Sequence, residues 1–247
     1  MNISLSTRAA LLSSTAMVLL AGSAMAADLT HVAPPPPPPL TPTPAISWTG
    51  FYVGVNAGWV GLDSKAIDEN GFYGTCCGAG SSETATLDPS GGLIGGQAGY
   101  NWQSGTMVVG VEGDFDAADA RGSKTVWPDH ATFATGLDSL ATARLRLGFL
   151  PTQQQNLLLF ATGGYAGGYI KDTLDPVALV IGNSSWSNGW TIGGGAEWAL
   201  NNQWSVKAEA LYVSFGDRTT SISDEGTYRF KFENSAVVAR AGLNFHF

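Results

Sequence analysis

The sequence predicts an all-β fold, an eight-stranded antiparallel transmembrane β-barrel with up-and-down connections. Three observations lead to this fold class: the two-faced alternation of the last twelve residues, the recurrence of such segments, and connections that are alternately short and long. Successive side chains of a strand point to opposite faces, so a wall between lipid and a lumen needs alternating apolar and polar residues. A soluble sandwich explains one such strand but not the pattern of connections.

The carboxyl-terminal stretch, residues 236–247, shows the alternation most clearly. One face carries Val237, Ala239, Ala241, Leu243, Phe245 and Phe247, and the other carries Arg240, Gly242, Asn244 and His246. The first face suits hydrocarbon and the second suits water. Because unpaired backbone groups are costly in lipid, this strand needs a neighbour on each edge. We expect it to close the barrel by pairing with the first strand.

Composition and the amino-terminal segments agree with an exported membrane protein. Charged residues are only 13% of the chain, whereas 32 glycines and 8 tryptophans are many for a soluble core. We predict a signal peptide over residues 1–26, in which Arg8 precedes an apolar stretch and Ala24-Met25-Ala26 forms the cleavage site. Residues 27–46, with six consecutive prolines, are predicted to form a stiff spacer, and residues 47–247 the barrel.

Seven further segments alternate in the same way. They run over residues 48–59, 92–102, 106–115, 140–149, 156–170, 190–198 and 204–212. The fifth, 156–170, is so rich in glycine and aliphatic residues that the pattern does not assign its faces. With the closing strand the total is eight, an even number, as expected of single-chain bacterial barrels.

The connections predict how the barrel sits in its membrane. Short links at 103–105, 151–155 and 201–203 alternate with long ones at 60–91, 117–138, 171–187 and 216–231. Outer-membrane barrels have short periplasmic turns and long external loops. The sequence therefore predicts a cell outer membrane location, with both termini and the proline-rich spacer in the periplasm.

Aromatic residues predict the two membrane boundaries, because their rings favour the headgroup level. The periplasmic belt is expected to contain Trp48, Tyr100, Trp102, Phe149, Trp198, Trp204, Phe245 and Phe247. The outer belt is expected to contain Trp59, Phe115, Tyr169, Trp190 and Phe215. In a soluble protein such residues would be spread along the strands.

Charges recur only on the lumen face of the predicted strands. The acids Glu112, Asp114, Glu197 and Glu209 balance the bases Arg144, Arg146, Lys207 and Arg240. Because buried charges persist only when paired, these residues predict a neutral salt-bridge network in the lumen. An interior of this size is just wide enough for side chains to fill. The rival interpretation is a charged lining for a narrow pore.

Several motifs also resemble a known family. They are 48–58 (WTGFYVGVNAG), 110–114 (GVEGD), 144–148 (RLRLG), 162–165 (TGGY), 207–212 (KAEALY) and the closing strand. Together they resemble the small OmpA-like eight-stranded outer-membrane β-barrel family, in particular the major surface antigens of rhizobia and related Gram-negative bacteria. The resemblance implies a surface-exposed structural and antigenic role, with adhesion, heme binding or pore activity in some members. It also implies that Leu243, Phe245 and Phe247 form the signal read by the barrel assembly machinery.

The first long connection is acidic. Asp63, Asp68, Glu69, Glu83 and Asp88 there oppose Lys65 alone. Such carboxylates are usually only solvated, and divalent-cation bridging to lipopolysaccharide is the alternative. Since neither the spacing of a calcium loop nor a basic stripe is present, we expect no metal site and no nucleic-acid partner.

The residues with reactive side chains are few. Cys76 and Cys77 are the only cysteines, and export to an oxidising space favours a strained vicinal disulfide or intermolecular pairing over metal binding. His130, beside Asp129, is the only histidine expected in an external loop. A lone loop histidine is no catalytic constellation, so we expect neither an enzyme nor a cofactor.

The sequence thus predicts an outer-membrane structural and surface-exposed protein with a closed, salt-bridged lumen and acidic external loops. Its expected partners are outer-membrane lipid and lipopolysaccharide, the barrel assembly machinery, and a host or environmental surface ligand. The alternative is a narrow porin, or a loop-mediated binder of heme or of a host surface molecule.

Overall fold

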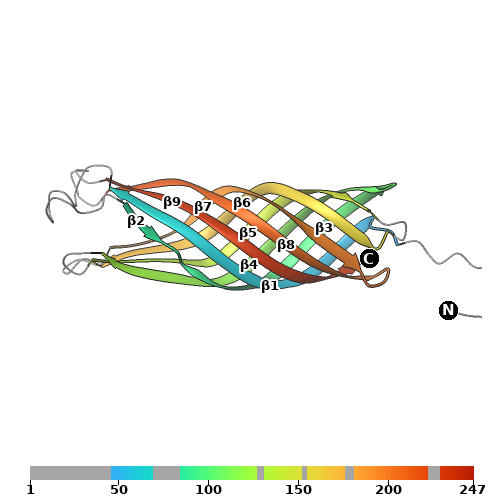
Figure 1. Cartoon of the computed structure of the whole chain (residues 1–247), viewed down its shortest axis with the longest axis horizontal. Helices are drawn as coiled ribbons and strands as arrows, with labels where there is room; N and C mark the ends of the chain where they lie inside the picture. The colour runs from blue at the N-terminus through green and yellow to red at the C-terminus, as the bar shows by residue number, and fades with distance from the viewer. Residues whose placement is uncertain (1–45, 69–83, 127–130, 152–154, 176–180, 222–228) are drawn as a thin grey trace, which may run out of the picture. The chain divides into compact units, whose positions relative to one another are not determined.

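The described part of the chain consists almost entirely of β-strands. The computed structural model describes residues 46–68, 84–126, 131–151, 155–175, 181–221 and 229–247. Its strands are β1 Gly50–Asp68, β2 Thr84–Leu87, β3 Ser90–Ser104, β4 Met107–Val126, β5 Ala131–Phe149, β6 Leu157–Asp175, β7 Ile181–Ala199, β8 Trp204–Ser221 and β9 Arg229–His246 (Figure 1). None of these residues forms a helix that is long and apolar enough to cross a membrane.

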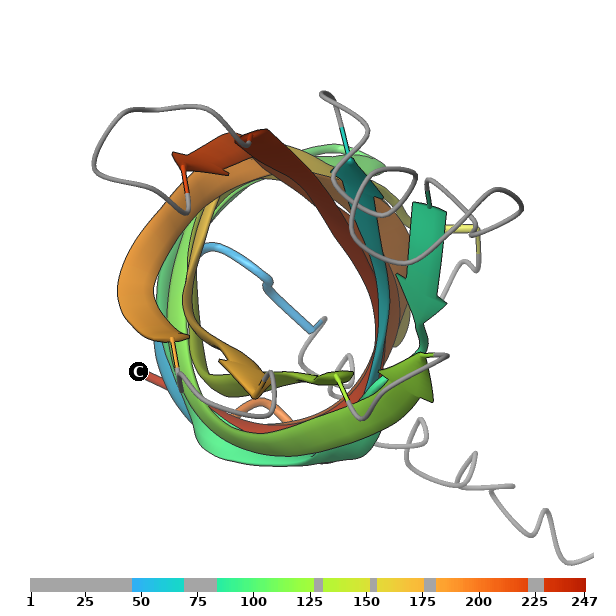
Figure 2. The same cartoon turned by 90° about the vertical axis from the view of Figure 1, so that its left-hand side faces the viewer.

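Antiparallel pairing closes the strands into a barrel. From β3 to β9 each strand pairs with the next, β1 pairs with β3, and the closing contact joins β1 to β9. The short β2 pairs with the same edge of β1 as β3 does, farther along the strand. Ser64 pairs with Leu87 of β2 and Gly61 pairs with Ser90 of β3, in the same register, so β2 and β3 occupy one position in the wall. The wall therefore has eight positions, and the predicted eight-stranded barrel is confirmed. Figure 2 shows the closed ring along its axis.

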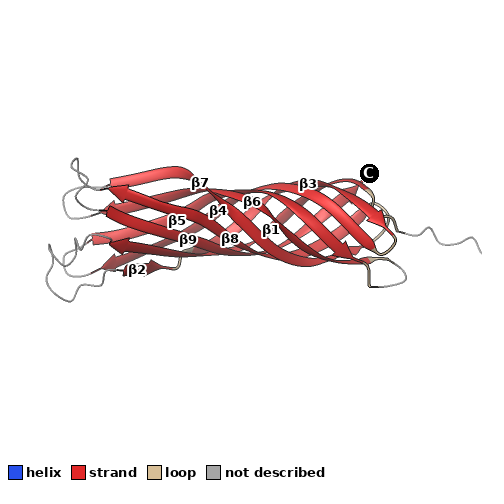
Figure 3. Cartoon of the chain, turned by 90° about the horizontal axis from the view of Figure 1, so that it is seen from above, coloured by secondary structure: helices blue, strands red, loops and turns tan. Residues whose placement is uncertain are grey.

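The strands are longer than the sequence predicted. β1 continues to Asp68 rather than ending at Trp59, and β5 begins at Ala131 rather than at residue 140. Much of the predicted long connections is therefore strand. Beyond the lipid boundary the outward residues become polar, so the two-faced pattern fades although the backbone pairing continues. Figure 3 shows the long strands running side by side along the barrel. Since about ten tilted residues span a membrane, a strand such as β4, with 20 residues, is long enough to project well beyond it.

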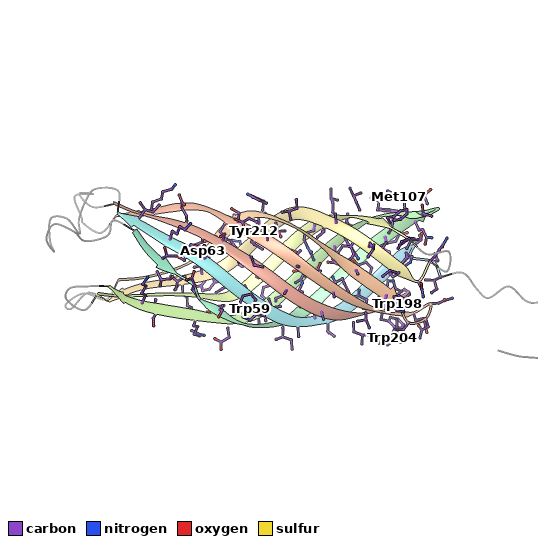
Figure 4. The ribbon with its side chains drawn as sticks, in the orientation of Figure 1. Trp59, Asp63, Met107, Trp198, Trp204 and Tyr212 are labelled. Carbon is purple, nitrogen blue, oxygen red and sulfur yellow. The ribbon has the colours of Figure 1, made fainter. Side chains whose placement is uncertain are left out.

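The outer face of the barrel is apolar between two levels of aromatic side chains. Trp198 and Trp204 lie at the end with the short turns, while Trp59 and Tyr212 lie farther along the barrel (Figure 4). Exposed apolar residues of the wall include Val55, Ile94, Val111, Leu145 and Ile192. An apolar band bounded by aromatic rings is the surface that lipid covers in barrels of this type.

Two aromatic residues predicted for the belts lie inside the barrel instead. Trp48 is 1% exposed and Phe215 is 3% exposed, so both predictions were wrong. Trp48 precedes β1, where strand alternation no longer applies, and its indole donates to the Gln155 carbonyl oxygen at 2.8 Å. Phe215 lies an odd number of residues from outward Tyr212, and its ring fills the space that Gly168 leaves open on β6.

The lumen is layered rather than polar throughout. At the periplasmic end Trp48, Val108, Leu150, Leu158 and Ala199 form one apolar cluster. A larger apolar cluster fills the outer half with Val60, Leu62, Leu93, Ala120, Leu137, Leu140, Ala166, Ile170, Leu211, Val213, Phe215, Ala236 and Val238. Leu158, Ala166 and Ile170 also assign the faces of β6 that the sequence left open. The charged residues predicted for the lumen lie in the layer between the two clusters.

We expect Phe215→Ala to destabilise the barrel by about 3–5 kcal/mol, because it opens a cavity in the outer apolar cluster. Phe115→Ala is the matched control, since this ring is 58% exposed on the outer face and its truncation leaves no internal cavity. Urea unfolding of both variants in lipid vesicles measures the difference. Equal losses of stability would contradict a packed layer at Phe215.

Candidate functional site

A layer of charged side chains crosses the lumen between the two apolar clusters. All eight residues predicted for the lumen point inward and are buried: Glu112, Asp114, Arg144, Arg146, Glu197, Lys207, Glu209 and Arg240. Their side chains are at most 2% exposed. Strand alternation places them. In β4, for example, Glu112 and Asp114 face inward because Val111, Gly113 and Phe115, which alternate with them, face outward.

Glu112 is the acceptor shared by most cations of the layer. Arg144 Nη2 lies 2.5 Å from its Oε1 atom, Lys207 Nζ lies 2.9 Å from the same atom, and Arg146 Nη1 lies 3.4 Å from Oε2. The Tyr52 hydroxyl also donates to Oε2 at 2.6 Å. Several donors thus offset the loss of hydration of the buried Glu112 carboxylate, because a buried charge is stable only when it is paired and hydrogen-bonded.

Two arginines bridge the same two acids from different strands. Arg144 lies 2.8 Å from Asp114 Oδ2 and 2.9 Å from Glu209 Oε2. Arg240 lies 2.9 Å from Asp114 Oδ1 and 2.7 Å from Glu209 Oε1. The arginines come from β5 and β9, and the acids from β4 and β8. The resulting ring of ion pairs spans the lumen and links strands that are not neighbours in the wall.

Asp116 also belongs to this layer, and the sequence analysis missed it. The side chain is completely buried, and it accepts a hydrogen bond from Arg240 Nη1. The predicted strand ended at Phe115 and the predicted connection began at residue 117, so the inward position between them was left unassigned. Alternation from Asp114 would have identified it. With Asp116, the buried residues of the layer comprise five acids and four bases, not the balanced set that was expected.

Glu197 anchors the periplasmic side of the layer. It accepts from Arg146 Nη2 at 2.7 Å, from Asn244 Nδ2 at 2.7 Å and from the Ser205 hydroxyl at 2.6 Å. The Arg146 guanidinium lies 4.1 Å above the Phe160 ring centre, which connects the charged layer to the aromatic surface beneath it. Each of the five carboxylates of the layer accepts at least one hydrogen bond.

Ser205, His246 and Glu197 are close together but do not form a catalytic triad. The Ser205 hydroxyl lies 2.8 Å from His246 Nε2, as a nucleophile and base would. Glu197, however, contacts the hydroxyl itself and lies 3.6 Å from the same ring nitrogen, so it does not orient the base from its other side. The Trp48 ring packs on His246 at 5.8 Å and buries the group.

The other predicted residues are distributed as follows. Leu243 and Phe247 are exposed on the outer face, and the Phe245 ring lies 5.1 Å from that of Trp204 and 5.2 Å from that of Phe247. Of the acidic first connection, Asp63, Lys65 and Asp68 lie in β1, and Asp88 lies between β2 and β3. Cys76, Cys77, Glu69, Glu83, Asp129 and His130 lie outside the described residues.

A family model described as "Outer membrane protein beta-barrel domain" matches residues 14–245 of the chain. The chain belongs to this family. Its location is therefore the outer membrane, and the short turns of the barrel face the periplasm.

Relatives of this outer-membrane barrel extend over nearly its whole length. The "31 kDa outer-membrane immunogenic protein" of Brucella melitensis is 36% identical over 236 residues, which cover 92% of this chain and 95% of that protein. The "22 kDa outer membrane protein" of Rhizobium leguminosarum is 27% identical and covers 82% of this chain and 80% of that protein. The crystal structure of OprG from Pseudomonas aeruginosa covers 82% of this chain and 99% of that one, with a TM-score of 0.52 and 15% identity, and shares the barrel fold.

We expect Arg144→Ala to destabilise the barrel by roughly 3–5 kcal/mol, because it leaves Glu112, Asp114 and Glu209 short of a buried counter-ion. Adding Glu112→Ala should recover part of that loss, and the double-mutant cycle measures their coupling. Arg121→Ala is the control, since this arginine pairs with Asp119 at 2.6 Å on an exposed surface. Urea unfolding in vesicles gives all values. Similar losses for the two arginine variants would mean that water screens the lumen.

Proposed function

We propose that this outer-membrane barrel is a closed, non-catalytic surface protein whose strands hold their external ends beyond the outer leaflet. The layered lumen is the observation that carries the proposal. A permeating ion would have to leave water and pass two apolar clusters that offer it no ligand. Between them, each carboxylate of the charged layer contacts a cation of the protein.

The length of the strands supports a role at the cell surface. β1, β4, β5 and β9 all extend past the level of Trp59 and Tyr212, where the apolar band ends. A paired wall keeps such projecting ends in fixed positions. The relatives named as immunogenic proteins agree with an accessible outer end, and they give no support to an enzyme.

The proposal includes three partners. Lipid covers the band between the aromatic levels. Lipopolysaccharide meets Arg121 and Lys171, which line an outward pocket of about 390 Å³ and both reach Asp138, at 3.9 Å and 2.5 Å. The assembly machinery recognises the end of β9, where Leu243 and Phe247 are exposed.

A narrow pore is the competing function, and the buried clusters argue against it. We expect no sustained ion conductance from the refolded wild-type barrel in planar bilayers, since neither apolar cluster offers a hydrated path. Phe215→Ala together with Leu137→Ala thins the outer cluster and tests whether the barrel can be made leaky. Steady wild-type conductance, with an ion selectivity that changes in Arg144→Ala, would instead establish a wet pore.

We expect deletion of Phe247 to lower insertion into the outer membrane while export continues. Its amide donates to the Phe51 carbonyl oxygen at 3.0 Å, and its ring is 77% exposed, so the residue is available to a recognition partner. Phe51→Ala is the control from the same belt, with a ring that is 65% exposed. Surface protease protection and cell fractionation measure insertion. Equal insertion of both variants would assign Phe247 to the belt alone.

A further inference from the structure

A pocket of about 300 Å³ opens on the outer face of the barrel, where β1 lies between β9 and the β2–β3 junction. Its walls include Trp59, Gly61, Asp63, Asp88, Ser90 and Ser235. It lies at the outer aromatic level, and Figure 4 labels Trp59 and Asp63 on the β1 strand that forms its floor. None of the charged residues of the lumen lines it, so it is independent of the closed-barrel function.

The Trp59 indole forms one wall because of the glycine two residues along β1. A Cβ atom on Gly61 would lie 2.4 Å from Cη2 of the indole, so only glycine lets the ring lie along the strand at this point. The ring is thereby directed over Gly61 toward the next outward residue of β1, which is Asp63. Trp59 remains 49% exposed and leaves aromatic surface open to the pocket.

Two carboxylates line the pocket, and among the described residues neither forms an ion pair. Asp63 and Asp88 lie between two paired stretches of the same register, Ser64 with Leu87 and Gly61 with Ser90, and the Leu62 amide donates to the Pro89 carbonyl oxygen between these stretches, so the two acids face each other across the β1 edge. Like charges in this arrangement repel. Among the described residues, no lysine or arginine nitrogen lies within 4.0 Å of either carboxylate. Lys65, the next outward residue of β1, is paired in register with Glu233 on β9.

We propose that this pocket binds an organic ammonium group of about the size of choline. A cation placed between the two carboxylates removes their repulsion, and an aromatic face attracts alkylated ammonium groups. The Ser90 and Ser235 hydroxyls supply further polar contacts at the rim. The group belongs either to a soluble amine or to a lipid headgroup, since the pocket lies at the membrane boundary.

A metal ion fits these residues less well. Magnesium and calcium need roughly six or more oxygen ligands, whereas the indole contributes none. The described residues contain no group of three or more His, Cys, Asp or Glu side chains that could hold a metal ion. An aromatic face instead attracts ammonium ions, and the two acids add charge attraction to it.

The test is an NMR titration of the refolded barrel in a non-ionic detergent, with choline chloride as the probe and sodium chloride at equal ionic strength as the reference. Choline should shift the Trp59 indole N–H resonance and the Asp63 and Asp88 amides. Its uncharged carbon analogue, 3,3-dimethyl-1-butanol, should bind at least roughly tenfold more weakly, because it has the shape of choline without the charge.

Variants separate the contributions to binding. Asp63→Asn, Asp88→Asn and Trp59→Leu should each weaken choline binding roughly three- to tenfold, and Trp59→Phe should restore part of the loss. Asp119→Asn and Trp190→Leu are the controls, since Asp119 is exposed on another strand and Trp190 is 52% exposed on the same aromatic level. Each variant is first checked for a folded spectrum, and none removes a residue of the buried lumen.

Three results would overturn the proposal. They are equal shifts from choline and its uncharged analogue, shifts from magnesium that persist in Trp59→Leu, and no response to choline at any concentration. Repeating the titration in nanodiscs identifies the source of the amine. Weaker choline binding in phosphatidylethanolamine than in phosphatidylglycerol would assign the site to a lipid headgroup, and equal binding would assign it to a soluble amine.

Discussion

The pairing of the first strand with the last is the contact on which the rest of the structure depends. In hydrocarbon, an unpaired backbone amide finds no water to replace its partner, so an open sheet edge is excluded. The register of β1 with β9, from Tyr52 opposite His246 to Asp68 opposite Phe230, removes the last edge. Closure also fixes the inner and outer face of each strand. Charged and polar side chains thereby lie in the lumen, where their hydrogen-bond and ion-pair partners must come from other strands of the barrel.

Much of this fold could be predicted from the alternation of residues, because a wall between lipid and lumen imposes it directly. The prediction was wrong for residues that do not lie in the part of the wall between lipid and lumen. Trp48 lies before the first strand, and it turns inward because its indole finds a carbonyl acceptor and an apolar cluster there. Beyond the outer aromatic level the outside is water, so alternation weakens; Phe215 was assigned to the outer belt although it is buried, and the buried Asp116 was overlooked.

For the charged layer, the sequence identified the residues but not the partners that meet across the lumen. Alternation is a local property of each strand, whereas Arg240 on β9 meets Asp114 on β4 only through the curvature of the closed wall. The glycine content has a related cause that a linear pattern does not reveal. A Cβ atom on Gly99 would lie 2.4 Å from the Tyr52 hydroxyl oxygen, and one on Gly95 would collide with Asp116. Inward glycines thus make room for the large charged and aromatic side chains.

The ion pairs across the lumen have a consequence for the order of assembly. Arg240 is separated from Asp114 by 126 residues, and it reaches this acid only when the final strand arrives. Before β9 pairs, Arg144 on β5 can already meet Glu112, Asp114 and Glu209, but Asp116 has no arginine among its described neighbours. The last strand supplies both the missing wall and a missing counter-charge. The strand that closes the wall thus also completes the compensation of the buried acids, so the seam and the charged layer are stabilised by the same element.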